Sequence, residues 1–203
     1  MKKVTFLSFL ILSIALVGLL GNWHFSRLAQ AHSLPGLQPS PTPEILPNGW
    51  HRYTDHAAGY AISYPPDVWF TISRDKPLEF PTVGLILPPS TGRGNQGMTV
   101  IVYRNAEALP RQQFLIQKIY SRLYRDQKQL ENLPMKEIQV GENVAYQVDL
   151  SPYFPALYIF HQDRVYFLAL HADMLSGLPP TSGAREMFFK IASTFTLVED
   201  EGR

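Results

Sequence analysis

The chain has 203 residues, of which 45% are hydrophobic and 17% are charged, and its formal net charge is +1. It contains no cysteine, which excludes disulfides, thiolate zinc sites and lipid attachment to an N-terminal cysteine. Three of the 18 basic residues precede His32, so 15 basic residues face 17 acidic ones from there onward, a formal charge of −2. We therefore expect no binding to nucleic acid.

Residues 1–26 are expected to form a membrane anchor or a signal peptide. Val4–Leu20 is an uncharged, almost wholly apolar run of 17 residues behind Lys2 and Lys3. As a helix it would span about 25 Å, slightly less than a hydrocarbon core of roughly 30 Å. The alternative is secretion after cleavage at Ala31, because Ala29-Gln30-Ala31 has the small-x-small form of a cleavage site. The lysine pair favours a cytoplasmic N-terminus, so both alternatives leave the rest of the chain outside the cytoplasm.

Residues 27–48 are predicted to be a linker. Within 13 residues the segment contains Pro35, Pro39, Pro41, Pro43 and Pro47. Such composition favours extended polyproline II and a semi-rigid tether, while a proline-rich ligand for a partner domain is the alternative. A tether has a purpose only if something stays attached to the membrane, which favours the retained anchor.

A folded domain is predicted over residues 49–198, followed by a charged tail at 199–203. Tyr60, Ile62 and Tyr64 alternate with smaller residues, as in a strand with one buried face. Similar patterns predict strands at Trp50–Thr54, Gly59–Tyr64, Val68–Ile72, Val83–Leu87 and Met98–Tyr103.

The second half of the domain is predicted to contain two helices and four strands. Apolar residues at helical spacing predict helices over Pro110–Leu130 and Gly183–Phe195, the latter capped by Ser182. Turn residues separate the strands, which should form an antiparallel meander: Lys136–Val140, Val144–Leu150, Ala156–His161 and Arg164–His171. The order predicts an α+β fold, with one twisted, mostly antiparallel sheet flanked by helices.

Two segments carry a resemblance to a known family. Tyr53–Trp69 reads YTDHAAGYAISYPPDVW, and Met187–Phe195 reads MFFKIASTF. Together with the order of elements between them, these segments resemble PsbP-like domains over about residues 50–198. The resemblance implies an α-β-α sandwich around an antiparallel sheet, and it implies a mostly non-catalytic binding or assembly role. The family includes extrinsic photosystem II subunits and bacterial exported domains, but this chain lacks the cysteine of the lipoprotein branch.

The best candidate for a binding surface is a basic stripe on the first predicted helix. Its polar face carries a single acid, Asp126, among five cations: Arg111, Lys118, Arg122, Arg125 and Lys128. Such a face is suited to an acidic protein or to anionic lipid headgroups. A solvated helix face without a partner is the alternative. Exposed aromatic residues at Tyr153-Phe154-Pro155 are a second candidate.

Motifs for chemistry are weak. Gly92–Gly97 matches the G-x-G-x-x-G pattern, but β-branched residues follow it where a dinucleotide site needs a helix, so we expect a hairpin loop. His51, Asp55 and His56 could approach one another, without a spacing diagnostic of metal. His161 and His171 should lie more than 20 Å apart on one hairpin. No serine lies in a G-x-S-x-G elbow, and Asp149, Asp163 and Asp173 lack the spacing of a calcium loop.

These observations predict a membrane-tethered, extracytoplasmic, non-catalytic binding or assembly domain without a cofactor or metal. Its alternatives are a photosystem II accessory subunit, which the resemblance permits, and an extracytoplasmic enzyme of unknown type.

Overall fold

The computed structural model describes residues 43–74, 78–91, 96–120, 134–148, 155–171 and 178–199, and the fold refers to that part of the chain. The run Val4–Leu20 lies outside it, and no helix within it combines the length and the apolar character that crossing a membrane requires. Arg122, Arg125 and Lys128 also lie outside the described residues.

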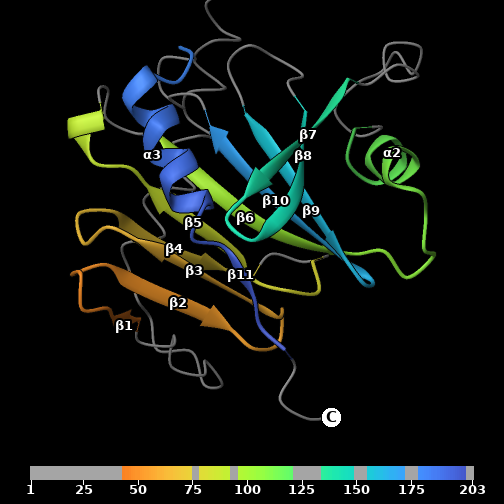
Figure 1. Cartoon of the computed structure of the whole chain (residues 1–203), viewed down its shortest axis with the longest axis horizontal. Helices are drawn as coiled ribbons and strands as arrows, with labels where there is room; N and C mark the ends of the chain where they lie inside the picture. The colour runs from red at the N-terminus through yellow and green to blue at the C-terminus, as the bar shows by residue number, and fades with distance from the viewer. Residues whose placement is uncertain are drawn as a thin grey trace, which may run out of the picture. The chain divides into compact units, whose positions relative to one another are not determined.

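The described strands form two antiparallel sheets (Figure 1). The smaller sheet has four strands in the order β1 (Glu44–Ile45), β2 (His51–Asp55), β3 (Tyr60–Tyr64) and β11 (Thr196–Leu197). The larger sheet has seven, in the order β4 (Trp69–Ser73), β5 (Thr82–Ile86), β6 (Gly97–Arg104), β10 (Arg164–His171), β9 (Ala156–His161), β8 (Asn143–Val148) and β7 (Met135–Val140).

The prediction of a single sheet was therefore wrong, although the α+β class and the antiparallel pairing agree with the structure. The division falls at Pro65-Pro66, between β3 and β4. Proline has no backbone N–H to donate to a strand ladder. A turn closed by a hydrogen bond from Val68 N to Pro65 O (3.2 Å) then leads the chain into the larger sheet.

The predicted meander is confirmed. β7 pairs with β8, β8 with β9 and β9 with β10, each antiparallel. His161 pairs with Arg164 across the β9–β10 turn, as the turn residues predicted, so His161 and His171 lie at opposite ends of the hairpin.

Strand β9 shows that the larger sheet is covered on both faces. Leu157 and Ile159 point into one hydrophobic cluster, while Ala156 and Tyr158 belong to another. Since alternate residues of a strand point to opposite faces, the two clusters lie on opposite sides of the sheet. The second cluster is completed by a short helix, α2 (Arg111–Phe114), which continues as the π-helical turn η2 (Leu115–Ile119).

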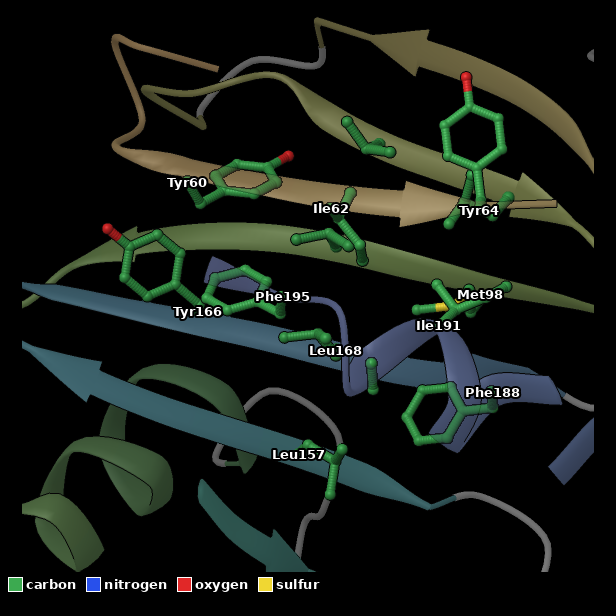
Figure 2. Packing of buried hydrophobic residues seen from close by; sticks show 14 of the residues in the cluster. Tyr60, Ile62, Tyr64, Met98, Leu157, Tyr166, Leu168, Phe188, Ile191 and Phe195 are labelled. Carbon is green, nitrogen blue, oxygen red and sulfur yellow. The ribbon is translucent and has the colours of Figure 1, made fainter. Parts of the chain in front are cut away.

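The first cluster joins the two sheets and helix α3 (Ser182–Ala192). Figure 2 shows Phe188 and Ile191 of α3 beside residues of both sheets. Tyr60 of β3 stacks on Phe195 with ring centroids 5.5 Å apart, and Tyr64 stacks on Phe70 of β4 at 5.3 Å. The contacts of Tyr64 with Phe70, and of Tyr60 with Tyr166 of β10 at 5.9 Å, attach the smaller sheet to the larger one.

Helix α3 differs from its prediction at both ends. Thr181, rather than Ser182, is its N-cap, because the Thr181 hydroxyl accepts the Ala184 N–H at 3.2 Å. The helix ends at Ala192 instead of Phe195, and the Thr194 hydroxyl then donates to Ile191 O and bonds Ser63 of β3. The turn places Phe195 in the core.

Candidate functional site

Two of the five cations of the predicted basic stripe lie in the described part of the chain. Arg111 begins α2, and Lys118 lies on η2. The apolar side of this helical segment, with Phe114, Leu115 and Ile119, is buried against the larger sheet. Arg111 is exposed and Lys118 is partly exposed, so the helix is amphipathic in the predicted sense over residues 111–119.

Arg111 is engaged with the sheet beneath it. Its guanidinium lies over the Tyr146 ring, 4.6 Å from the centroid, and donates to the Tyr146 hydroxyl. That hydroxyl donates in turn to Glu137 Oε2 at 3.0 Å. Burial and the hydrogen bond to Glu137 raise the pKa of Tyr146. The cation, the ring and the carboxylate therefore form one chain across β8 and β7.

Lys118 is also paired with an acid. Its Nζ lies 2.6 Å from Glu107 Oε1, and both side chains are substantially exposed. An exposed pair of this kind contributes little to stability, about 0–1 kcal/mol. Its consequence is electrostatic: Glu107 and Glu137 partly neutralise the surface at the two described positions of the stripe. The sequence pattern did not predict these acids, because they lie outside the helix.

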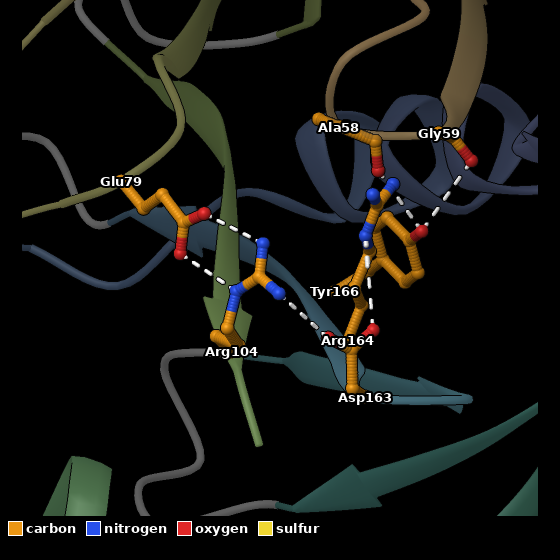
Figure 3. A network of polar contacts seen from close by, with 7 residues as sticks. All are labelled: Ala58, Gly59, Glu79, Arg104, Asp163, Arg164 and Tyr166. Atoms are coloured by element: carbon orange, nitrogen blue, oxygen red, sulfur yellow. Dashed lines mark hydrogen bonds and ion pairs between the residues drawn. The ribbon is translucent and has the colours of Figure 1, made fainter. Parts of the chain in front are cut away.

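A second polar cluster lies where the two sheets meet, and the sequence pattern did not predict it (Figure 3). Arg104 at the end of β6 binds both carboxylate oxygens of Glu79, at 2.8 and 2.6 Å, and donates to Asp163 Oδ2 at 2.9 Å. The bidentate hydrogen bond from Arg104 lowers the pKa of Glu79, and the Arg104 pKa is raised in return. The three residues come from three separate segments of the chain, so no local spacing identifies them.

Phe80 and Arg164 extend this cluster to the smaller sheet. The guanidinium groups of Arg104 and Arg164 lie 5.8 and 5.3 Å from the centroid of the buried Phe80 ring. Beside them, the Tyr166 hydroxyl donates to Ala58 O at 3.0 Å in the β2–β3 turn. The charged groups of Arg104, Glu79 and Asp163 are paired with one another. Together with the bond from Tyr166 to Ala58, the cluster serves as a junction between the sheets.

Two of the three candidate metal ligands, Asp55 and His51, have contacts elsewhere in the fold. Asp55 accepts the Ala58 N–H at 2.9 Å and the Tyr53 hydroxyl at 3.2 Å, while His51 packs edge-on against Tyr64. Within the described ranges, no three His, Asp or Glu side chains gather as metal ligands would. His171 is hydrogen-bonded to Thr99, and burial lowers its pKa.

The remaining candidates lie mostly outside the described residues. They include Gly92 to Asn95 of the glycine-rich loop, Asp149, Asp173 and Tyr153-Phe154. Gly97 already begins β6, so a strand follows the G-x-G-x-x-G pattern, as predicted. Asp163 belongs to the Arg104 cluster.

The most exposed large aromatic side chain in the described residues is Trp69 of β4. It is 71% exposed, and its partner across the β4–β5 ladder, Ile86, is 39% exposed. Residues 68–72 were predicted to form a strand. Neither face of that strand carries a charged residue, so the sequence pattern did not indicate which face is buried. Only the packing of Phe70 against Tyr53 and Tyr64 decides this.

No protein-family model matches this sequence, and no curated protein matches it. Among solved structures, the chain is similar to the solution structure of cyanobacterial PsbP (CyanoP) from Synechocystis sp. PCC 6803, with 12% identity, 82% of this chain and 98% of that chain covered, and a TM-score of 0.44. It is also similar to a crystal structure from Bacteroides thetaiotaomicron VPI-5482, with 10% identity, 75% of this chain covered and a TM-score of 0.43. The chain spans half the length of that protein, 50%. Since both TM-scores are below 0.5, neither likeness carries a conclusion about function.

Proposed function

We propose that this protein is a membrane-tethered, extracytoplasmic domain that binds a partner and catalyses no reaction. The anchor is Val4–Leu20, and the tether is the part of residues 27–48 that precedes β1, since Glu44–Ile45 pairs with β2 in the smaller sheet. The binding domain resembles PsbP-like domains through Tyr53–Trp69 and Met187–Phe195. The partner is an acidic protein, and an anionic lipid surface is the alternative.

One observation carries this proposal: the helical segment Arg111–Ile119 buries its apolar side and presents Arg111 and Lys118 outward. The stripe continues in the sequence with Arg122, Arg125 and Lys128. Glu107 pairs directly with Lys118, whereas Glu137 is linked to Arg111 through the Tyr146 hydroxyl. An acidic partner would compete with Glu107 for the Lys118 ammonium group and with the Tyr146 hydroxyl for the Arg111 guanidinium.

Crosslinking in intact membranes, followed by mass spectrometry, tests the proposal. Replacing all five stripe cations with Gln should abolish the crosslinked partner. A matched variant with five cations replaced on other elements should retain it: Arg52, Arg74, Lys136, Arg185 and Lys190. Equal crosslinking by both variants would contradict the proposal.

Two further measurements separate the candidate partners. Glu107→Gln frees Lys118, so it should strengthen the capture of an acidic protein. Sedimentation of the purified full-length protein with vesicles of neutral lipid, with and without phosphatidylserine, tests the lipid alternative. Stripe-dependent binding to the anionic vesicles alone, with no protein crosslink, would favour lipid.

A further inference from the structure

The outer edge of β4 is the exposed strand edge with the fewest features that prevent pairing. Edge strands present unpaired backbone N–H and C=O groups, and proteins protect them with short strands, prolines or charges. Among the described strands, the two sheets end at β1, β11, β4 and β7. Comparing these four edges shows which one is unprotected.

Three of the edges are protected. β1 has two residues and lies between Pro43 and Pro47, and β11 also has two residues. β7 carries the exposed charges of Lys136 and Glu137. Each of these features disfavours the addition of another strand.

β4 has none of these protective features. It has five residues, Trp69-Phe70-Thr71-Ile72-Ser73, without charge or proline. Its outward face carries the exposed Trp69, beside Ile86. The unpaired backbone of such a strand is complementary in chemistry to another extended polypeptide.

We infer that β4 pairs antiparallel with β4 of a second copy of this chain, around a two-fold axis at Thr71. This inference concerns a surface other than the basic stripe and does not depend on the proposed function.

The sequence of β4 is self-complementary in this register. Thr71 lies opposite itself, and Trp69 lies opposite Ser73 of the second copy, on the outward face. Phe70 lies opposite Ile72 on the core face. Thr–Thr and aromatic–β-branched pairs are favourable cross-strand neighbours, each contributing about 0.2–1 kcal/mol relative to alanine pairs. No like charges meet along the five paired residues.

Charge at the two ends of the strand also favours an antiparallel pair. The exposed Asp67 lies just before β4, and the exposed Arg74 lies just after it. Residues 74–76 read Arg-Asp-Lys, with two cations and one acid. Antiparallel pairing brings the Asp67 end of one copy to the Arg74 end of the other, at both ends of the shared ladder.

The absence of native cysteine makes a direct test possible. A single Thr71→Cys substitution places two thiols opposite each other at the two-fold axis. Directly opposed Cβ atoms lie about 4.5–5.5 Å apart, close to the roughly 3.5–4.5 Å of a disulfide. Under mild oxidation of membranes that contain the full chain, we expect a disulfide-linked dimer. The matched control is Lys136→Cys on β7, an exposed position on the opposite edge of the same sheet.

The expected result is several-fold more crosslinked dimer for Thr71→Cys than for Lys136→Cys. Comparable crosslinking at both positions, or none at Thr71→Cys, would overturn the inference. Crosslinking of Thr71→Cys only to a different protein would also overturn it, in favour of a partner that adds its own strand.

A cysteine-free measurement supplies the second readout. Thr71→Lys places two ammonium groups opposite each other at the axis. Thr71 is exposed, and within its own chain its hydroxyl makes one hydrogen bond of 3.3 Å to Gly84 O, which the substitution removes. Sedimentation velocity of the full chain in detergent should give a dimer for the natural sequence and a monomer for Thr71→Lys. A natural protein that sediments as a monomer at all concentrations tested would overturn the inference.

Discussion

Gly59 and Arg164 are in close contact at the junction of the two sheets. A β-carbon placed on Gly59 would lie 2.5 Å from Nη1 of Arg164, and the Gly59 backbone has φ +73°. The Arg164 guanidinium in turn lies over the Phe80 ring (Figure 3 shows Gly59 and Arg164). Glycine at residue 59 therefore allows the β2–β3 turn of the smaller sheet to rest against the first residue of β10.

Replacement of Gly59 by Ala should lower the free energy of unfolding through two effects. The left-handed backbone costs an L-residue about 1–2 kcal/mol. In addition, the new methyl group must displace the Arg164 guanidinium from its position over Phe80. Urea unfolding followed by circular dichroism measures the sum.

Gly49→Ala is the matched control, because Gly49 has φ +79° and an added β-carbon would meet no atom of the described residues within 4 Å. Gly49→Ala should lower the free energy of unfolding only by the cost of the left-handed backbone, about 1–2 kcal/mol. Equal losses for the two variants would mean that the contact with Arg164 contributes nothing.

Two buried tyrosines should respond in opposite ways to loss of the hydroxyl. Tyr166→Phe removes the donor to Ala58 O, so the free energy of unfolding should fall by about 1–2 kcal/mol. The Tyr60 hydroxyl is buried and has no hydrogen-bond partner among the described residues, so Tyr60→Phe should be neutral or stabilising by up to about 1 kcal/mol. Urea unfolding of both variants at neutral pH makes the comparison. A large destabilisation by Tyr60→Phe would show that its hydroxyl has a bond in solution.

Alkaline pH should destabilise the protein partly through Tyr64. Burial raises the pKa of Tyr64 from 10.0 to about 12. A raised pKa in the folded state means that the stabilisation is complete below pH 10 and is lost as the pH rises toward 12. Tyr64→Phe should therefore lose less stability than the natural protein over that interval. The urea midpoint of each protein at several pH values from 8 to 12 tests this, and parallel profiles would contradict it.

Thr181 should contribute more to the free energy of unfolding than an ordinary loop residue does. Its hydroxyl caps Ala184 N and donates to Thr91 O at 2.5 Å, which links α3 to the 3₁₀ turn Pro89–Thr91. Thr181→Ala should cost about 1 kcal/mol of stability, and faster hydrogen exchange of the Ala184 amide should accompany the loss. Thr181→Ser keeps the hydroxyl and should remain close to the natural protein in both measurements.

Local sequence patterns predicted much of the fold. The alternation in Tyr60–Tyr64 predicted β3, and the turn at Gln162-Asp163 predicted the register of β9 with β10. The strands and turns of these segments depend on neighbours within a few residues, which is the range over which a sequence pattern carries information. The start of the helical segment at Arg111 was also predicted.

The candidate sites were less predictable from the sequence. The stripe cations Arg111 and Lys118 were identified from helical spacing, but their acids Glu137 and Glu107 were not. Glu137 lies on β7, and only packing of the helix on the sheet brings it to Arg111 through Tyr146. The cluster around Arg104 was missed for the same reason, because Glu79 and Asp163 reach Arg104 from separate segments of the chain.

By itself, the sequence determined the order of the longer strands and helices, the meander and the absence of cysteine, since each follows from residue type or short-range spacing. It did not predict the two-residue strands β1 and β11. Tertiary structure alone decided the division into two sheets and the exposure of Trp69 beside the covered Phe70. An isolated strand has two equivalent faces and two equivalent edges. Which of them meets solvent depends on the other strands and helices that pack against it, and those come from distant parts of the chain.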